Sequence, residues 1–192
     1  AFDQFPDLPS ELKRLAWLSL DSQEGQEYWN AMELMGQYAA ANHACIHRHI
    51  AENLGATVLL DLENHHNFAW KEKHVIDGVA REVIVHRKGA TPAFPGQRGF
   101  VGGSMGDDAV ILEGVDSAEA KAALYSTVHG AGRLHGRTSA KKRFARSEMD
   151  DWLKRRGVTL VGADLDESPM AYRRLDEVLT HHAASARVVH RL

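Results

Sequence analysis

The segment Val128-His129-Gly130-Ala131-Gly132-Arg133 places a histidine among small residues and follows it with an arginine. Gly130 and Gly132 have no side chains that would keep a ligand away from the backbone. Arg133 carries a planar cation, which suits bidentate contact with phosphate. The imidazole of His129 could therefore meet a phosphoryl group, and the alternative is a turn with a capping histidine. The segment alone leaves both interpretations open.

A second segment with histidines, Glu63-Asn64-His65-His66-Asn67, follows a predicted strand. A neutral imidazole beside an amide or a carboxylate suits a divalent metal such as Mn²⁺ or Zn²⁺. Adjacent histidines usually point to different sides, so we expect only one of His65 and His66 to bind an ion. The alternative is a solvated loop.

Two further segments have the composition of phosphate-binding sites. His86-Arg87-Lys88-Gly89-Ala90-Thr91 places two cations before a glycine at the end of a predicted strand, where backbone N–H groups could join them. Gly102-Gly103-Ser104-Met105-Gly106 is a flexible loop with a central hydroxyl, but Asp107-Asp108 would repel phosphate unless a metal intervened. A strand end with solvated charges remains the alternative for the first segment, and the second resembles a phosphate-binding loop in composition only.

A basic stretch begins inside the first histidine segment, although the formal net charge of the chain is −3. Such a stretch suits the backbone of a nucleic acid, but it is also typical of a solvated helix face. Its members are Arg133, Arg137, Lys141, Lys142, Arg143 and Arg146. His43 and His47 have helical spacing for a shared metal, but no glutamate follows His43 as in zinc proteases, so we do not count them as a site.

Length and composition restrict the class of protein. A chain of 192 residues suits one domain and can bury a core. The single cysteine, Cys45, excludes an intramolecular disulfide framework and a Cys-rich zinc site, and it indicates a reducing cytoplasm. No apolar run approaches the roughly 18 residues of a membrane span, and no signal peptide is evident. Because the chain lacks an initial methionine and ends soon after Val188-Val189, both ends look cut.

The hydrophobic pattern predicts an α+β protein of mixed helices and short strands, without repeats or a domain boundary. A long helix should begin at Asp21 or Ser22, with Glu24 in its first turn, and end at Gly55. The other expected elements are a strand over 56–62, short strands over 82–86, 99–101 and 109–112, helices over 117–126 and 141–156, a strand over 158–161, and a helix over 172–184.

Taken together and in order, these segments resemble the RtcB family of RNA-splicing ligases. The resemblance spans nearly the whole chain, and its motifs are specific because they occur in the same order as in the family. The matching residues are His66-Asn67 with Glu72, His86 to Thr91 with Phe94-Pro95, Gly103 to Gly106, Ser126 to Arg133, and Ala171-Tyr172 followed by Asp176-Glu177-Val178. Asp21-Ser22, Glu24-Gly25 and Tyr28 also resemble a helix of the family.

The resemblance implies a GTP- and Mn²⁺-dependent ligase that joins an RNA 3′-phosphate or 2′,3′-cyclic phosphate to a 5′-hydroxyl, as in tRNA splicing or RNA repair. His129 corresponds to the histidine that attacks the GTP α-phosphorus and becomes covalently linked to GMP. The GMP is then passed to the RNA 3′-phosphate, and the 5′-hydroxyl displaces it. A nucleophilic imidazole must be neutral, and a nearby metal ion and arginine would favour that form by lowering its pKa.

The resemblance also implies roles for other residues. His66 corresponds to a Mn²⁺ ligand, and Tyr172 corresponds to an aromatic residue that packs on guanine. The residues expected at the nucleotide are Asn67, Ser104, Met105, Gly106, Gly130, Ala131, Gly132 and Tyr172. The residues expected at RNA or nucleotide phosphate are Arg87, Lys88, Arg133 and Arg137.

The matching residues correspond to the C-terminal half of the family fold, so we expect residues 1–192 to form that part of one RtcB-like domain. Three family segments that hold metal ligands, Asp-x-x-Cys, Gly-Asn-His-Phe and His-x-Gly-Ser-Arg-Gly, are absent from the chain. We therefore expect the chain alone to be a poor or inactive ligase that needs the missing half, with an activating protein as a further possible partner. The alternative is a noncatalytic RNA- or nucleotide-binding relative without a complete metal site. We expect a cytoplasmic protein with no membrane partner.

Overall fold

A computed structural model describes residues 7–192 and divides the chain into two compact units, Ala1–Leu59 and Leu60–Leu192. Helices and short antiparallel strands are mixed, so the predicted α+β class is confirmed. The expectation of a single RtcB-like domain stays a prediction. Within residues 7–192, none of the helices combines the length and apolarity needed to cross a bilayer.

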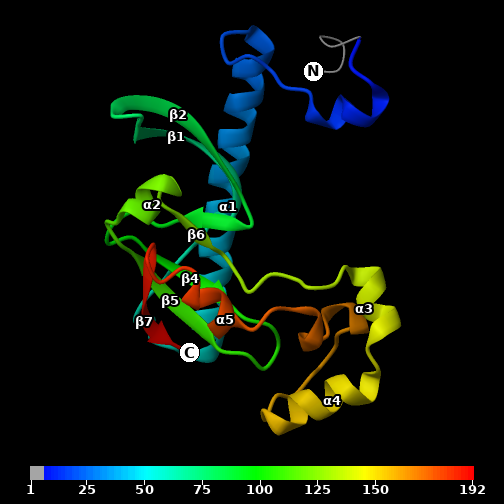
Figure 1. Ribbon diagram of the computed structural model, residues 1–192. Coiled ribbons are helices and arrows are strands. Elements are labelled where there is room, and N and C mark those ends of the chain that lie inside the picture. The colour runs from blue at the N-terminus through cyan, green and yellow to red at the C-terminus, as the bar shows by residue number, and fades with distance from the viewer. Residues whose placement is uncertain (1–6) are drawn as a thin grey trace. The chain divides into compact units, whose positions relative to one another are not determined.

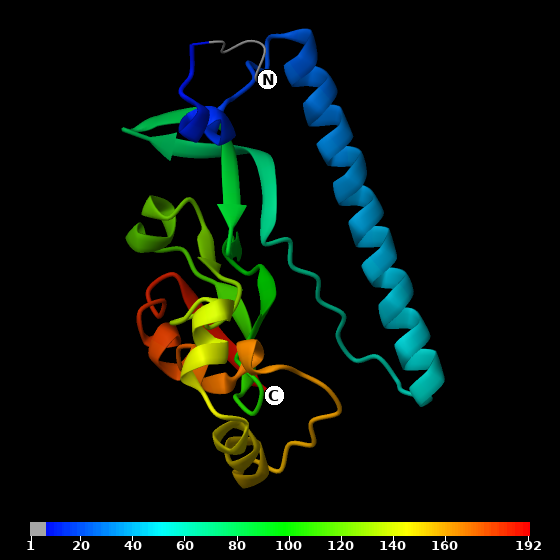
Figure 2. The same cartoon turned by 90° about the vertical axis from the view of Figure 1, so that its right-hand side faces the viewer.

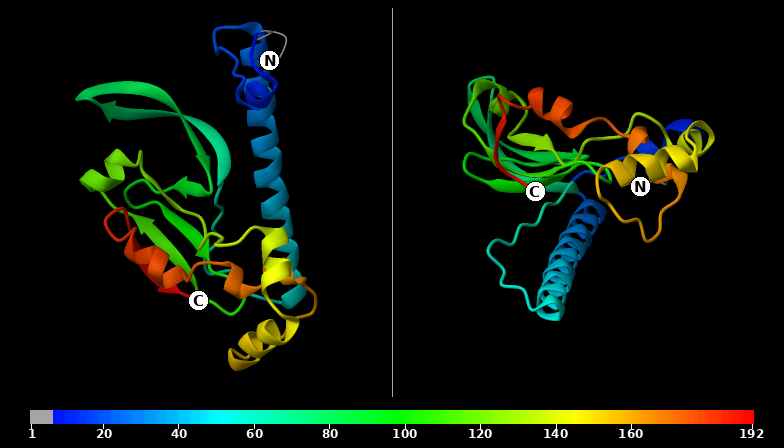
Figure 3. Two further views of the ribbon diagram at one scale, coloured as in Figure 1. Left: turned by 45° about the vertical axis from the view of Figure 1, so that its right-hand side comes forward. Right: turned by 90° about the horizontal axis from the view of Figure 1, so that it is seen from below.

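The first unit contains a short 3-10 helix, η2 (Ser10–Leu15), and the long helix α1 (Gln23–Leu54), which Figure 3 shows as an uninterrupted coil. The N–H of Gly25 donates a 3.0 Å hydrogen bond to the Ser22 side chain, which caps the first turn. Gly55 has φ of 59° and ends the helix in the left-handed conformation. Both predicted ends of this helix are confirmed.

The second unit contains three small antiparallel sheets (Figures 1 and 2). The longest strands form the hairpin of β1 (Asn67–Ile76) and β2 (Val79–Lys88). A second sheet pairs β3 (Ala90–Pro92) with β6 (Ser126–Val128). The third sheet has the order β4-β5-β7, and its strands are β4 (Arg98–Gly102), β5 (Ala109–Gly114) and β7 (Ala186–Arg191).

Short helices complete this unit, and the last of them packs on the core. They are α2 (Ala118–Ala122), α3 (Arg137–Arg143), α4 (Arg146–Arg155), the 3-10 helices η3 (Leu165–Glu167) and η4 (Pro169–Ala171), and α5 (Leu175–Thr180). The core packs β4, β5 and α5 around the glycine segment after β6. Its buried residues are Val101, Val110, Leu112, Ala131, Leu175, Leu179 and Ala186. Ala131 thus ties the backbone next to His129 into the core.

Two predicted strands are wrong. Residues 56–62 form no strand, and Leu59 is 94% exposed. Residues 158–161 also form none, and Val161 is 99% exposed. In both cases an apolar run has no neighbouring strand to pair with, and such a run alone does not define a strand. The segment with His66 therefore precedes the long strand β1 rather than following one.

The predicted helices of the second unit are also corrected. The helix expected over 141–156 is two helices, because Phe144 and Ala145 adopt extended backbone between α3 and α4. The helix expected over 117–126 ends early, and residues from Ser126 onward join strand β6. The last helix is shorter than expected, and the strand that follows it, β7, was not predicted.

Candidate functional site

His66 and His129 lie against one another in the second unit. Their rings are stacked, with centroids 4.4 Å apart and planes inclined by 11°. His129 directly follows β6, and His66 directly precedes β1. The structure therefore brings together the predicted nucleophile and the predicted metal ligand, which are 63 positions apart in sequence (129 − 66).

Gly89 explains how these two segments meet. Its N–H donates a 2.9 Å hydrogen bond to the His66 carbonyl, and the next residue, Ala90, pairs with Val128. Gly89 has φ of 72°, a conformation that favours glycine. A Cβ at this position would lie 3.8 Å from the His129 ring, which is ordinary contact. The positive φ at position 89, and not a lack of space for a Cβ, is therefore the reason for glycine there.

The surroundings of His129 favour the neutral imidazole. Its pKa is lowered by partial burial first, and then by the nearby charges of His66 and Lys88. Two stacked rings at this distance cannot both carry a proton without strong repulsion. The geometry therefore suits an imidazole that acts as a nucleophile at neutral pH.

The glycine loop after β4 lies on the other side of the His129 segment. Gly102 forms a parallel bridge with Gly130, and the N–H of Ala131 donates a 3.2 Å hydrogen bond to the Gly102 carbonyl. A Cβ on Gly130 would lie 3.4 Å from that carbonyl oxygen, so the two backbones approach closely. The structure thus brings the predicted nucleotide segments 102–106 and 130–132 together.

Each member of the acidic pair that follows this loop faces an arginine, one in a buried position and one at the surface. The Asp107 carboxylate lies 2.6 Å from Nη2 of Arg174, and its side chain is only 5% exposed. Asp108 lies 3.3 Å from Nη1 of Arg191. The repulsion of phosphate that the sequence suggests is therefore reduced without a metal ion.

Trp152 of α4 fixes the tip of the same loop. Its Nε1 donates a 3.3 Å hydrogen bond to the Met105 carbonyl. The guanidinium groups of Arg156 and Arg174 lie 3.4 and 5.2 Å from the centroid of its ring. The Ser104 hydroxyl makes no hydrogen bond to any residue in the described part of the chain, so it is available to a ligand.

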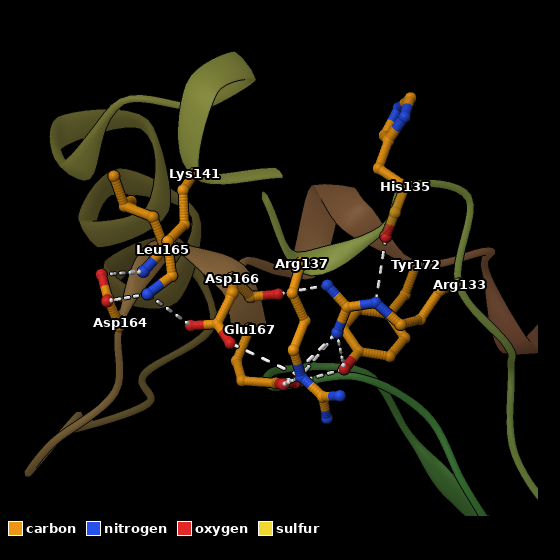
Figure 4. A network of polar contacts seen from close by, with 9 residues as sticks. All are labelled: Arg133, His135, Arg137, Lys141, Asp164, Leu165, Asp166, Glu167 and Tyr172. Atoms are coloured by element: carbon orange, nitrogen blue, oxygen red, sulfur yellow. Dashed lines mark hydrogen bonds and ion pairs between the residues drawn. The ribbon is translucent and has the colours of Figure 1, made fainter. Parts of the chain in front are cut away.

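Arg133 and Tyr172 are linked by several contacts, shown in Figure 4. Nη1 of Arg133 donates a 2.7 Å hydrogen bond to the Tyr172 hydroxyl, and the guanidinium carbon lies 4.7 Å from the ring centroid. The same guanidinium also contacts Glu167 and donates to the carbonyls of Asp166 and His135. Among residues 7–192 these contacts leave a single N–H without a partner, so a bidentate phosphate contact would break one of them.

Two other cations of the basic stretch face acidic residues of η3 and its cap. Nζ of Lys141 lies 2.5 Å from Asp164, and Nε of Arg137 lies 3.6 and 3.5 Å from Asp166 and Glu167. These pairs are partly exposed and contribute little stability individually. Lys142 and Arg143, at the end of α3, make no ion pair with any described residue.

Arg87 and Lys88, neighbours in sequence, have opposite environments. The Arg87 side chain is 1% exposed and makes two hydrogen bonds to Glu72. It also donates to Ser126 and to the Leu124 carbonyl. This placement differs from the predicted phosphate contact, because the guanidinium is buried and its donors are engaged. Lys88 is exposed and close enough to lower the pKa of His129, so it is the cation best placed to meet a ligand there.

The part of the chain that the structure describes holds no complete metal centre. Among the described residues, no group of three or more His, Cys, Asp or Glu side chains could hold a metal ion. A site that includes His66 would therefore need further ligands from outside the described residues. His43 and His47 stack on α1 with centroids 6.5 Å apart, outside any such group.

Sequence reasoning did not identify Glu72, Trp152 and Glu167 as supports of the site. Glu72 was noted only as part of the family resemblance, and a strand pattern does not reveal a partner fifteen residues away in the chain (87 − 72). Glu167 belongs to an acidic run, Asp164-Leu165-Asp166-Glu167, that could have been paired with the basic stretch upstream. Its spacing gave no sign of which cations it would meet.

Comparison with known proteins identifies the family. The family model described as "tRNA-splicing ligase RtcB" matches residues 3–192. A "tRNA-splicing ligase RtcB" of Methanococcus maripaludis is 33% identical, over 86% of this chain and 40% of that protein. One from Pyrococcus furiosus is 32% identical, over 96% of this chain and 22% of that protein. An "RNA-splicing ligase RtcB" of Mycobacterium tuberculosis is 34% identical, over 94% of this chain and 46% of that protein.

The chain belongs to the RtcB family. It spans less than half the length of these curated relatives.

Proposed function

We propose that this chain carries the nucleophile and part of the nucleotide site of a GTP-dependent RNA ligase. One observation carries the proposal: His129 is partly buried, is stacked on His66, is followed by a bare glycine backbone, and lies close enough to Lys88 for this cation to lower its pKa. A neutral imidazole so placed can attack a phosphorus atom. The names of the relatives support RNA ligation as the overall reaction.

In the proposed reaction, an imidazole nitrogen of His129 attacks the α-phosphorus of GTP. A P–N bond forms, the bond to the leaving oxygen breaks, and pyrophosphate departs. The GMP then passes to the 3′-phosphate of an RNA end, and the 5′-hydroxyl of another end displaces it to form the phosphodiester. The free Ser104 hydroxyl, the backbone of segments 102–106 and 130–132, Asn67 and Tyr172 are the proposed nucleotide contacts, and Lys88 offsets phosphate charge.

Mn²⁺ remains a proposed cofactor, with His66 as one ligand. Because the described residues hold no complete set of ligands, the other ligands would come from elsewhere in the full-length protein, and no step above is routed through the metal. RNA with 3′-phosphate and 5′-hydroxyl ends is the proposed substrate. An RNA 2′,3′-cyclic phosphate would first be opened by water, which breaks the bond to the 2′-oxygen and leaves a 3′-phosphate and a 2′-hydroxyl.

Incubation of the full-length protein with labelled GTP and Mn²⁺ tests the proposal. We expect an acid-labile, hydroxylamine-sensitive label on the wild type and none on His129→Ala. His181→Ala is the matched control, because this histidine is exposed and lies at the end of α5. A label that persists in His129→Ala would refute the assignment. A wild type that binds GTP and RNA but takes no label would instead support the noncatalytic alternative.

A further inference from the structure

Glu167 lies at the centre of the polar network in Figure 4. Its carboxylate accepts the hydroxyl proton of Tyr172, and each of its oxygens lies 3.3 Å from Nη1 of Arg133. The same carboxylate lies 3.5 Å from Nε of Arg137. One acidic side chain therefore holds an aromatic residue and two cations from different segments.

Arg133 connects this carboxylate to the backbone that carries His129. The N–H of Arg173 donates a 3.0 Å hydrogen bond to the Gly132 carbonyl, and the N–H of Leu134 donates a 2.7 Å bond to Ala171. Arg133 and Tyr172 also face one another as a β-bridge. Segments 130–134 and 171–173 thus lie side by side. The Glu167 carboxylate adds a side-chain contact to one residue of each segment, Arg133 and Tyr172.

We infer that Glu167 is a positioning residue of the nucleotide site: it fixes the Tyr172 ring relative to Arg133 and, through Arg133, the loop on which His129 lies. The inference rests on the proposed function, in which Tyr172 and residues 130–132 contact the nucleotide. Glu167 itself does not touch the nucleotide in this scheme.

The hydrogen bonds of Tyr172 also limit what it offers to a ligand. Its hydroxyl proton is donated to Glu167, and its oxygen accepts from Arg133. Its pKa is raised by burial first and then by the Glu167 carboxylate, although Arg133 opposes this. Tyr172 is therefore held as a neutral phenol that offers a ligand the ring face opposite the Arg133 guanidinium, and not its hydroxyl.

The first test measures this arrangement without GTP. The phenol titration of Tyr172 in the full-length protein is isolated by subtracting the ultraviolet pH titration of a Tyr172→Phe variant, made separately in the wild-type and the Glu167→Gln backgrounds. We expect Glu167→Gln to move this titration to lower pH, because the carboxylate that opposes phenolate formation is gone. An unchanged titration would overturn the inference whether or not the protein is a ligase.

The second test measures the consequence for the nucleotide. With labelled GTP and Mn²⁺, we expect Glu167→Ala to raise the GTP concentration for half-maximal labelling about tenfold, with a smaller change in maximal rate, because a misplaced ring weakens binding more than chemistry. Glu167→Gln should recover part of the loss, since its amide oxygen can still accept the Tyr172 proton. Glu177→Gln, an exposed residue of α5, is the matched control and should match the wild type.

The outcomes separate the two proposals. If Glu167→Ala labels with wild-type GTP dependence, the positioning role is wrong. If the wild type takes no label, the proposed function fails, and the titration alone decides the role of Glu167. If Glu167→Ala does not fold, Glu167→Gln carries both tests because it preserves the side-chain volume.

Discussion

The Glu72 carboxylate and the Arg87 guanidinium form a buried ion pair with two hydrogen bonds across β1 and β2. Nη1 lies 2.6 Å from Oε1, and Nη2 lies 2.9 Å from Oε2. The same guanidinium donates to Ser126 and to the Leu124 carbonyl, just before strand β6. The Glu72–Arg87 pair therefore links the β1–β2 hairpin to strand β6, which leads into His129. This link explains why the segments of His66 and His129 keep fixed positions relative to one another.

Removal of the Glu72 carboxylate should destabilise the fold strongly. Glu72→Ala leaves Arg87 buried without its counter-ion, and we expect the free energy of unfolding to fall by about 3–5 kcal/mol. Denaturant unfolding measures this loss. Arg98→Ala is the control, because the Arg98 side chain is 51% exposed and its partner Glu113 keeps a second cation, Arg187. Equal losses in the two variants would show that the buried pair has no special role.

The same carboxylate should make stability depend on acid pH. Burial raises the pKa of Glu72, but hydrogen bonds from Arg87 and His74 outweigh it, so the net pKa lies below 4.5. For a depressed pKa, the stabilisation is complete above the unfolded value and is lost as the pH falls through the folded one. The wild type should therefore lose its advantage over Glu72→Gln below about pH 4.5. A difference in melting temperature between the two proteins that stays constant from pH 7 to pH 3 would contradict this.

Two glycines of the second unit should differ sharply in their tolerance of a methyl group. A Cβ on Gly103 would lie 2.6 Å from the Asp107 Cβ and 2.7 Å from the Asp108 carbonyl oxygen. Because this backbone oxygen cannot move away cheaply, Gly103→Ala should cost about 1–3 kcal/mol and weaken GTP binding. Gly136 has nothing within 4 Å of the same position, so Gly136→Ala is the control. Equal thermal stability of the two variants would show that the loop relaxes.

The parts of the fold that could be predicted from sequence are those set by local chemistry. Ser22 and Gly55 mark the ends of α1 because caps act within a few residues. The run over 56–62 has strand-like composition, but a strand also needs a partner, and no local pattern shows whether one exists. For the same reason β7 was missed, since its pairing with β5 joins residues far apart in the chain.

In the site, as in the fold, local chemistry could be predicted from sequence and contacts between distant residues could not. The chemistry of His129, Gly130 and Lys88 is visible in sequence, and the structure brings these residues together with His66. The roles of the arginines could not be predicted, because they depend on which carboxylates reach them. Arg87 and Arg133 resemble phosphate ligands in type, yet their guanidinium groups are largely satisfied by Glu72 and Glu167.

Trp152 should control the mobility of the glycine loop. Replacement by leucine removes the hydrogen bond to the Met105 carbonyl and the stacking of Arg156, together worth about 1–2 kcal/mol of local stability. Because exchange from a locally opened state follows this free energy, amide hydrogens of residues 103–107 should exchange about tenfold faster, whereas those of β5 should not change. Mass spectrometry of deuterium uptake measures both regions in one experiment.

Arg156→Ala keeps the hydrogen bond between Trp152 and Met105 and should give a smaller increase in uptake at residues 103–107. Uptake that rises equally in β5 would show a general loss of stability, and unchanged uptake at 103–107 would show that α4 does not hold the loop.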